Sequence, residues 1–274
     1  MVAIGNPAAA FSYRCVVLQA PEIAIALCGL PARPGQPWGS ATPDACVWVR
    51  EQRVRAVALD ASRPDVRARD LGRSARRDLS AMLRRTELEL AGIDLWIPPE
   101  HFNDDAKSQR AMDTVSQTAA LAGELARLVG GRSVPVVSVT LPGGLDGRVR
   151  REIGEAADRH GAVVADHTPG AIHEGAGLGV GVDPAACLLA GESAGKRAVA
   201  GGRSAYLRLS DLNATGRCGV GAEGARLDLT AYAGACLTVG GRWITLDTRG
   251  VGDPERAAES GVSAWRDATT LPGL

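Results

Sequence analysis

Short apolar runs and longer segments with helical spacing alternate along the chain. Eight runs have the length and the aliphatic or β-branched composition of buried strands: Ile23–Cys28, Ala56–Leu59, Gly92–Ile97, Val134–Thr140, Ala162–Ala165, Leu178–Val182, Ala205–Leu209 and Trp243–Leu246. The segments between them are long enough for helices, and this alternation is typical of βαβ units with parallel strands.

Three of the intervening segments have a clear amphipathic period. Their apolar residues recur at steps of three and four, which predicts helices over about residues 106–129, 70–85 and 146–159. Gly130 directly follows the first of these segments and predicts its end. The segments 168–176 and 191–202 are rich in glycine, so we expect little helix there.

These elements predict one α/β domain, a (β/α)8 (TIM) barrel over residues 21–274. Such a barrel needs roughly 250 residues, which the chain of 274 residues provides. The first 20 residues are rich in alanine and proline without a period, and we interpret residues 1–20 as an N-terminal extension. Residues 31–43 have a similar composition and predict a long loop.

Charge and cysteine content exclude several classes of function. Lys plus Arg and Asp plus Glu number 31 each, so no overall field would attract nucleic acid or an anionic membrane. The six cysteines follow neither zinc-ligand nor disulfide-framework spacing. No run has the roughly 20 apolar residues of a membrane span, and no signal peptide is evident. We therefore expect a cytoplasmic protein that binds a small molecule. The sequence is also compatible with a homo-oligomer.

In a parallel barrel, the polar residues that close the strands point into the mouth. Several carboxylates among them would repel one another, so they require protons, arginines or a divalent cation. Asp183 also has a purely structural explanation, because Asp before Pro184 is a common helix start. The candidates are Asp60, Arg63, Trp96, Glu100, His101, Asp166, His167, Asp183, Arg208, Asp211, Asp247 and Arg249. His173 lies in a glycine-rich loop, where we expect it to be exposed.

Five segments of the chain resemble the sugar phosphate isomerase/epimerase family of xylose-isomerase-like TIM barrels: AGIDLWIPPEHF, VVADH, GVGVDPAACLLAG, YLRLSDLNATGRCGVGAEGARLD and WITLDTRG. The resemblance implies a divalent metal (Mg²⁺, Mn²⁺ or Zn²⁺) held at Asp166, Asp183 and Asp247. It also implies that Arg217 orients the substrate.

The resemblance is incomplete at the metal site. The family pattern has a histidine where this chain has Arg208, and a second histidine after the strand-six Asp, where this chain continues Asp183-Pro184-Ala185-Ala186. Asp in place of Glu at two positions draws the ligand oxygen back by about 1.5 Å. A guanidinium repels a cation and can instead pair with Asp183 or Asp166. Two alternatives therefore follow from the sequence: a divalent metal held by the three carboxylates, or a mouth without a metal in which an arginine neutralises them.

Two hypotheses about function follow. In the first, the protein is an isomerase or epimerase acting on a sugar or sugar phosphate, by aldose–ketose or C3-epimerisation proton transfer. Its catalytic residues would be Asp166, Asp247, Arg217, His101 and Glu100, with His167 as a further acid or base. In the second, the barrel has lost catalysis and serves as a binding or scaffold protein. A metal-dependent endonuclease is disfavoured by the four histidines and the zero net charge.

Overall fold

Eight parallel strands close into a barrel in the order β1-β10-β7-β6-β5-β4-β3-β2. The structure is a computed structural model that describes residues 19–130, 133–173, 175–200 and 205–270. The strands are β1 (Glu22–Ala26), β2 (Ala56–Asp60), β3 (Glu89–Asp94), β4 (Val136–Val139), β5 (Val163–Asp166), β6 (Leu178–Val182), β7 (Tyr206–Leu209) and β10 (Trp243–Leu246). The predicted single (β/α)8 barrel is confirmed, and β6 and β10 have the predicted bounds.

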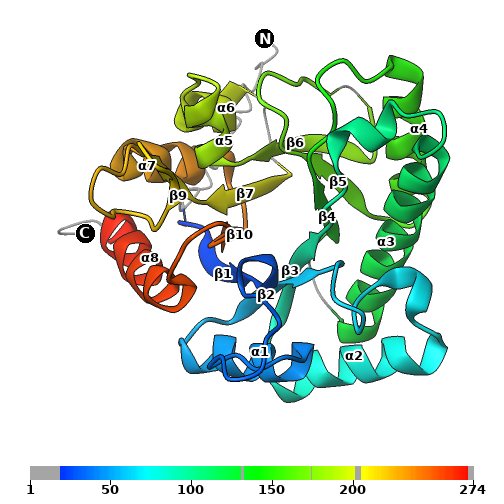
Figure 1. Cartoon of the computed structure of the whole chain (residues 1–274), viewed down its shortest axis with the longest axis horizontal. Helices are drawn as coiled ribbons and strands as arrows, with labels where there is room; N and C mark the ends of the chain where they lie inside the picture. Colours follow the sequence, from blue (N-terminus) through cyan, green and yellow to red (C-terminus); the bar gives the residue numbers. More distant parts are fainter. Residues whose placement is uncertain (1–18, 131–132, 174, 201–204, 271–274) are drawn as a thin grey trace, which may run out of the picture.

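Helices form a ring around this barrel (Figure 1). They are α1 (Thr42–Glu51), α2 (Arg73–Arg85), α3 (Ser108–Val129), α4 (Gly147–Asp158), α5 (Pro184–Leu189), α6 (Ala194–Ala200), α7 (Leu229–Val239) and α8 (Pro254–Thr269). Three short 3₁₀ helices, η1 (Leu27–Gly29), η2 (Ala68–Asp70) and η3 (Pro99–Phe102), follow β1, β2 and β3. As expected, the described residues between β5 and β6 form no helix, whereas α6 occupies seven residues of the segment 191–202, in which we expect little helix. Residues 1–18 of the predicted extension lie outside the described residues.

Local chemistry sets the helix ends. Gly130 ends α3 in the left-handed region at φ 76°, where a side chain would be strained, and its N–H donates to the carbonyl of Ala126. Asp146 begins α4 by accepting from the N–H of Arg148 at 2.6 Å. Asp183 precedes α5 in the same way and accepts from the N–H of Ala186 at 3.5 Å. The structural role expected for Asp183 is thus present.

Small side chains line much of the barrel interior. One layer contains Ala24, Ala56, Ala91 and Trp243, and the next contains Ala26, Ala58, Val136, Ala165 and Tyr206. In most such barrels bulky branched side chains fill these layers. Here the alanines leave room for two large aromatic rings and, nearer the mouth, for Arg208 of β7.

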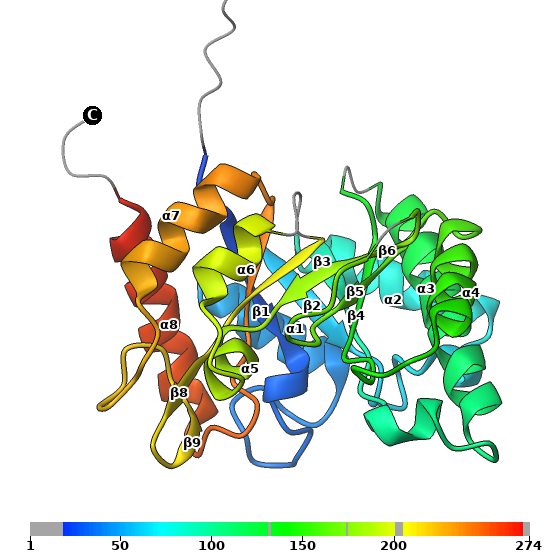
Figure 2. The same cartoon turned by 90° about the horizontal axis from the view of Figure 1, so that it is seen from above.

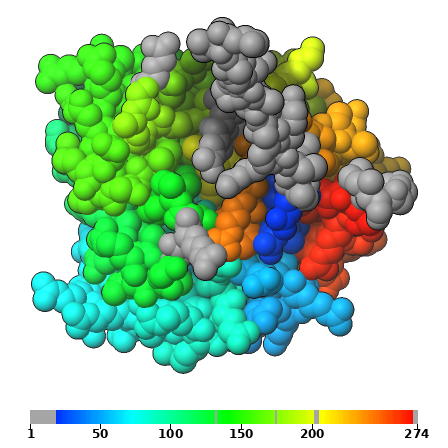
Figure 3. Space-filling model, turned by 180° about the vertical axis from the view of Figure 1, so that it is seen from behind, coloured from blue at the N-terminus to red at the C-terminus, as the bar shows by residue number. Residues whose placement is uncertain are grey.

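The two ends of the barrel differ. A hairpin of β8 (Asp211–Asn213) and β9 (Gly216–Cys218) follows β7 and lies at the end where the strands finish (Figure 2). Asp211 holds its base by accepting from the N–H groups of Leu212, Arg226 and Leu227 at 2.8–3.0 Å. The opposite face, where β1 and β10 begin, is seen from behind in Figure 3.

The structure also bears on membrane spans and on the cysteines. Among the described helices, none is both long and apolar enough to cross a bilayer. The cysteines at 28, 46, 187, 218 and 236 are free thiols, and Cys15 lies outside the described residues.

Candidate functional site at the barrel mouth

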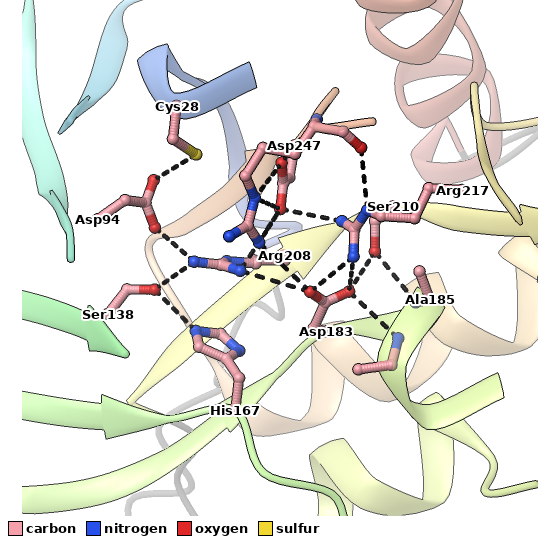
Figure 4. Close-up of polar contacts among 12 residues, drawn as sticks. Cys28, Asp94, Ser138, His167, Asp183, Ala185, Arg208, Ser210, Arg217 and Asp247 are labelled. Atoms are coloured by element: carbon pink, nitrogen blue, oxygen red, sulfur yellow. Dashed lines mark hydrogen bonds and ion pairs between the residues drawn. The ribbon is translucent and has the colours of Figure 1, made fainter. Parts of the chain in front are cut away.

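Arg208 occupies the centre of the mouth (Figure 4). It points inward from β7 with 4% of its side chain exposed. Its Nη2 donates to Asp94 Oδ1 at 2.5 Å and to Ser138 Oγ at 2.6 Å. Its Nη1 lies 3.4 Å from both Asp183 Oδ2 and Asp247 Oδ2. One guanidinium thus joins carboxylates from β3, from the end of β6 and from the end of β10.

Two further arginines cover the same carboxylates from the solvent side. Arg217, on β9, lies 3.1 Å from Asp183 Oδ2 and 2.9 Å from Asp247 Oδ2. Arg249 Nη2 lies 2.5 Å from Asp247 Oδ2 and 3.6 Å from Asp183 Oδ2. We call Asp94, Asp183, Asp247, Arg208, Arg217 and Arg249 the mouth cluster. Its three cations balance its three anions.

The arginines keep the mouth carboxylates ionised. Burial acts to raise the pKa of Asp183, but the charges of Arg217 and Arg208 outweigh it and hold the pKa well below its usual range. Burial also acts to raise the pKa of Asp247, yet Arg249, Arg208 and Arg217 lower it to about 2. Both side chains are therefore anions at neutral pH, each neutralised within the protein.

His167 and Cys28 flank the mouth cluster. His167 Nε2 lies 2.9 Å from Ser138 Oγ, and burial together with the Arg208 charge holds the pKa of His167 well below its usual value. The imidazole is therefore neutral at pH 7. The Cys28 thiol donates to Asp94 Oδ2 at 3.3 Å, and burial, with Asp94 nearby, raises its pKa well above the usual value.

Asp166 does not join the mouth cluster, so the expected grouping of Asp166 with Asp183 and Asp247 is wrong. Its neighbours Ala165 and His167 point into the barrel, and side chains alternate along a strand, so Asp166 points outward. There it accepts from Arg150 Nη1 at 3.0 Å and from the N–H of Leu141 at 3.0 Å.

A second buried network surrounds Asp166. Thr168 donates to it through both its N–H and its hydroxyl, and His173 Nε2 lies 3.2 Å from Asp166 Oδ2. Burial acts to raise the pKa of Asp166, but the His173 and Thr168 contacts lower it to about 2. The expectation that His173 is exposed is also wrong, because only 1% of its side chain is accessible.

The remaining candidates mostly support loops. Asp60 Oδ1 accepts from the N–H of Ser62 at 2.8 Å, and Arg63 donates to the carbonyl of Leu30 at 2.7 Å. Asp211 holds the β8–β9 hairpin, as described above.

The loop after β3 carries the other three candidates. Trp96 is 64% exposed, and Arg249 Cζ lies 5.6 Å from its ring centroid, so its indole belongs to the rim of the mouth. Glu100 is exposed on η3 and His101 is half-buried beside it. Among the described contacts, none joins either residue to the mouth cluster. The catalytic roles assigned to Glu100 and His101 remain predictions.

Asp94, Ser138 and Cys28 belong to the site but are not among the residues expected there from the sequence. The strand expected over Gly92–Ile97 has Asp94 in its interior, whereas β3 ends at Asp94 itself. A charged residue within the apolar run Ile93-Asp94-Leu95 was the available signal. Ser138 and Cys28 are small and carried no such signal.

The mouth residues do not fit a divalent cation. Within the described ranges, no three His, Cys, Asp or Glu side chains are arranged to hold a metal ion. The space between Asp94, Asp183 and Asp247 holds the Arg208 guanidinium, whose charge repels a cation.

Comparison with solved structures agrees with the fold. The probable 3-DHS dehydratase AsbF from Bacillus anthracis matches with a TM-score of 0.62 at 9% identity, over 92% of this chain and all (100%) of that one. A xylose isomerase domain protein from Alicyclobacillus acidocaldarius matches at 0.62 and 16% identity, over 91% and 98% of the two chains. A D-tagatose 3-epimerase-like protein matches at 0.63 and 10% identity, over 91% and 100%.

These similarities establish the architecture. The chain has the fold of the xylose-isomerase-like TIM barrels. No protein-family profile and no curated protein sequence matches it.

Proposed function

We propose that this protein is a binding or scaffold barrel that has lost metal-dependent catalysis and holds a small polyhydroxylated or phosphorylated ligand at the rim of its mouth. The observation that carries the proposal is the position of Arg208, paired with Asp94 and close to Asp183 and Asp247. Carboxylates neutralised in this way have little free charge to offer a metal or to remove a proton.

The rim supplies the groups for ligand binding. Arg217 and Arg249 are 25% and 21% exposed. A guanidinium has five N–H donors, more than the contacts with Asp183 and Asp247 use, so each arginine can still donate to a hydroxyl or phosphate oxygen at the rim. Trp96 stands beside Arg249 with most of its ring accessible, and an aromatic face of this kind packs against the apolar face of a sugar. Both features support a sugar or sugar phosphate as the ligand class.

The test is a pair of assays on the full chain. Fructose 6-phosphate and tagatose serve as probes, followed by NMR for binding and for conversion, with and without added Mg²⁺, Mn²⁺ or Zn²⁺. We expect saturable binding of fructose 6-phosphate, about tenfold weaker in Trp96→Ala, and no metal-dependent conversion of either sugar. Conversion that rises with metal and disappears with EDTA would contradict the proposal.

A second function is favoured by one observation, the neutral imidazole of His167 beside charged arginines. In this alternative, an isomerase or epimerase works without metal. The neutral His167 imidazole removes the proton next to a substrate carbonyl, while Arg217 or Arg249 stabilises the enediolate oxygen. EDTA-resistant incorporation of solvent deuterium into tagatose would support this alternative. It would also rule out the binding protein as the whole function.

A further inference from the structure

A cavity of about 520 Å³ opens at the end of the barrel where the strands begin, opposite the mouth. Its lining residues stand at or beside the first residues of their strands, as with Gly179 in β6, Tyr206 in β7 and Trp243 in β10. The volume lies within the roughly 300–1,000 Å³ range of small-molecule sites. Neither the mouth cluster nor the proposed function involves this cavity.

Small side chains among the described lining residues leave this space unfilled. Ala91, Gly179 and Ala205 line the cavity with side chains too small to fill it. Gly179 is required by a close approach, since a Cβ there would lie 2.7 Å from Ala205 Cβ. A Cβ on Gly92 would lie 2.8 Å from Tyr206 Cε2, so that glycine admits the aromatic ring that walls the cavity. The opening thus results from specific small residues.

One buried polar group in the aromatic walls lacks a partner. Trp243 is 8% exposed, and within the described part of the chain its Nε1 has no hydrogen-bond partner. A buried donor without a partner costs about 1–3 kcal/mol. Trp Nε1 can only donate, so the missing partner of Trp243 is an acceptor.

The charge at the cavity is already balanced. Arg242 lines it and places its Cζ 4.7 Å from the centroid of the Trp243 ring. However, its Nη2 lies 2.6 Å from Glu89 Oε2, in an ion pair that neutralises the guanidinium. An anionic ligand would have to compete with Glu89, whereas a neutral one would not.

We propose that this cavity is a binding site for a small, neutral, planar molecule of one or two rings that carries a carbonyl-type hydrogen-bond acceptor. The rings lie against Tyr206 and Trp243, and the acceptor receives the Trp243 indole N–H. Small apolar lining residues select for a flat ligand, and the Arg242–Glu89 pair selects against an anion.

Two probes of similar size test the proposal by isothermal titration of the full chain. Coumarin is flat, neutral and carries a carbonyl acceptor, whereas naphthalene has the rings without the acceptor. We expect saturable binding of both, with coumarin about tenfold tighter. Trp243→Phe keeps an aromatic ring but lacks the N–H, so it should remove this preference and leave naphthalene binding unchanged.

Two more variants locate the binding. Ala205→Phe fills the cavity and should abolish binding of both probes, with folding checked by circular dichroism. Trp96→Phe, at the rim of the mouth, should leave both affinities unchanged. Absence of saturable coumarin binding to the wild-type chain would overturn the proposal. So would a coumarin preference that survives Trp243→Phe, or coumarin binding lost in Trp96→Phe.

Discussion

Replacing Arg208 with methionine removes the central cation of the mouth cluster while keeping a side chain of similar length. Asp183 and Asp247 keep Arg217 and Arg249 within 3.6 Å, so each remains neutralised. Asp94 loses its 2.5 Å contact with Arg208 and retains the Cys28 thiol at 3.3 Å. The variant therefore leaves one buried carboxylate without a counter-charge.

The expected cost follows from this count. Removing one partner of a buried ion pair costs about 3–5 kcal/mol, chiefly because the other charge stays buried. Urea unfolding at pH 7, followed by circular dichroism, should show this loss for Arg208→Met. The double variant Arg208→Met/Asp94→Asn should recover about 2 kcal/mol or more of it, because the uncompensated charge is gone.

A matched control separates this effect from a general loss of arginine. Arg148 is 80% exposed and pairs with Glu152 on the surface of α4, so Arg148→Gln should change the free energy of unfolding by less than about 1 kcal/mol. If Arg208→Met costs no more than this control, the reasoning is refuted. It is also refuted if Asp94→Asn adds to the loss instead of reducing it.

Three further predictions concern the mouth and its support. Burial and the Arg208 charge keep His167 neutral in the folded protein, because they hold its pKa well below the usual value. In the unfolded chain the same imidazole takes up a proton as the pH falls below about 6.5. The free energy of unfolding should therefore fall by up to about 1.4 kcal/mol per pH unit. His167→Gln should flatten this slope in urea titrations between pH 6.5 and 4.5, values set by the usual histidine pKa. Gly181→Ala places a Cβ 2.7 Å from the buried His167 ring and should cost about 1–3 kcal/mol, whereas Gly143→Ala meets nothing within 4 Å and should cost nothing measurable. Asp211→Ala removes the acceptor of three N–H groups and should speed hydrogen exchange over residues 211–227; unchanged exchange would contradict that role.

The barrel could be predicted because its strands carry a strong signal. Runs such as Leu178–Val182 and Trp243–Leu246 are short, apolar and bounded by polar or glycine residues, and the structure begins and ends β6 and β10 there. The β8–β9 hairpin was not predicted. Its strands have three residues each, too few to show an alternating pattern.

The site could be predicted only in part, because sequence does not show which residues of a barrel strand point inward. Both faces of a parallel strand are buried, so β5 is apolar on each side and the orientation of Asp166 relative to His167 is not encoded in hydrophobicity. Asp183, Asp247 and Arg208 lie together at the mouth. The ion pair between Arg208 and Asp94 joins residues 114 positions apart, which no local pattern reveals.

Metal binding in solution tests the central claim most directly, namely that Arg208 takes the place of a cation. The full chain would be titrated calorimetrically with Mn²⁺, beside Arg208→His, which exchanges the guanidinium for an imidazole among the same carboxylates. We expect no saturable binding to the wild-type chain below about 1 mM, and tighter binding to the variant. One Mn²⁺ ion bound per wild-type chain at micromolar concentration, and lost in Asp183→Asn, would contradict the account.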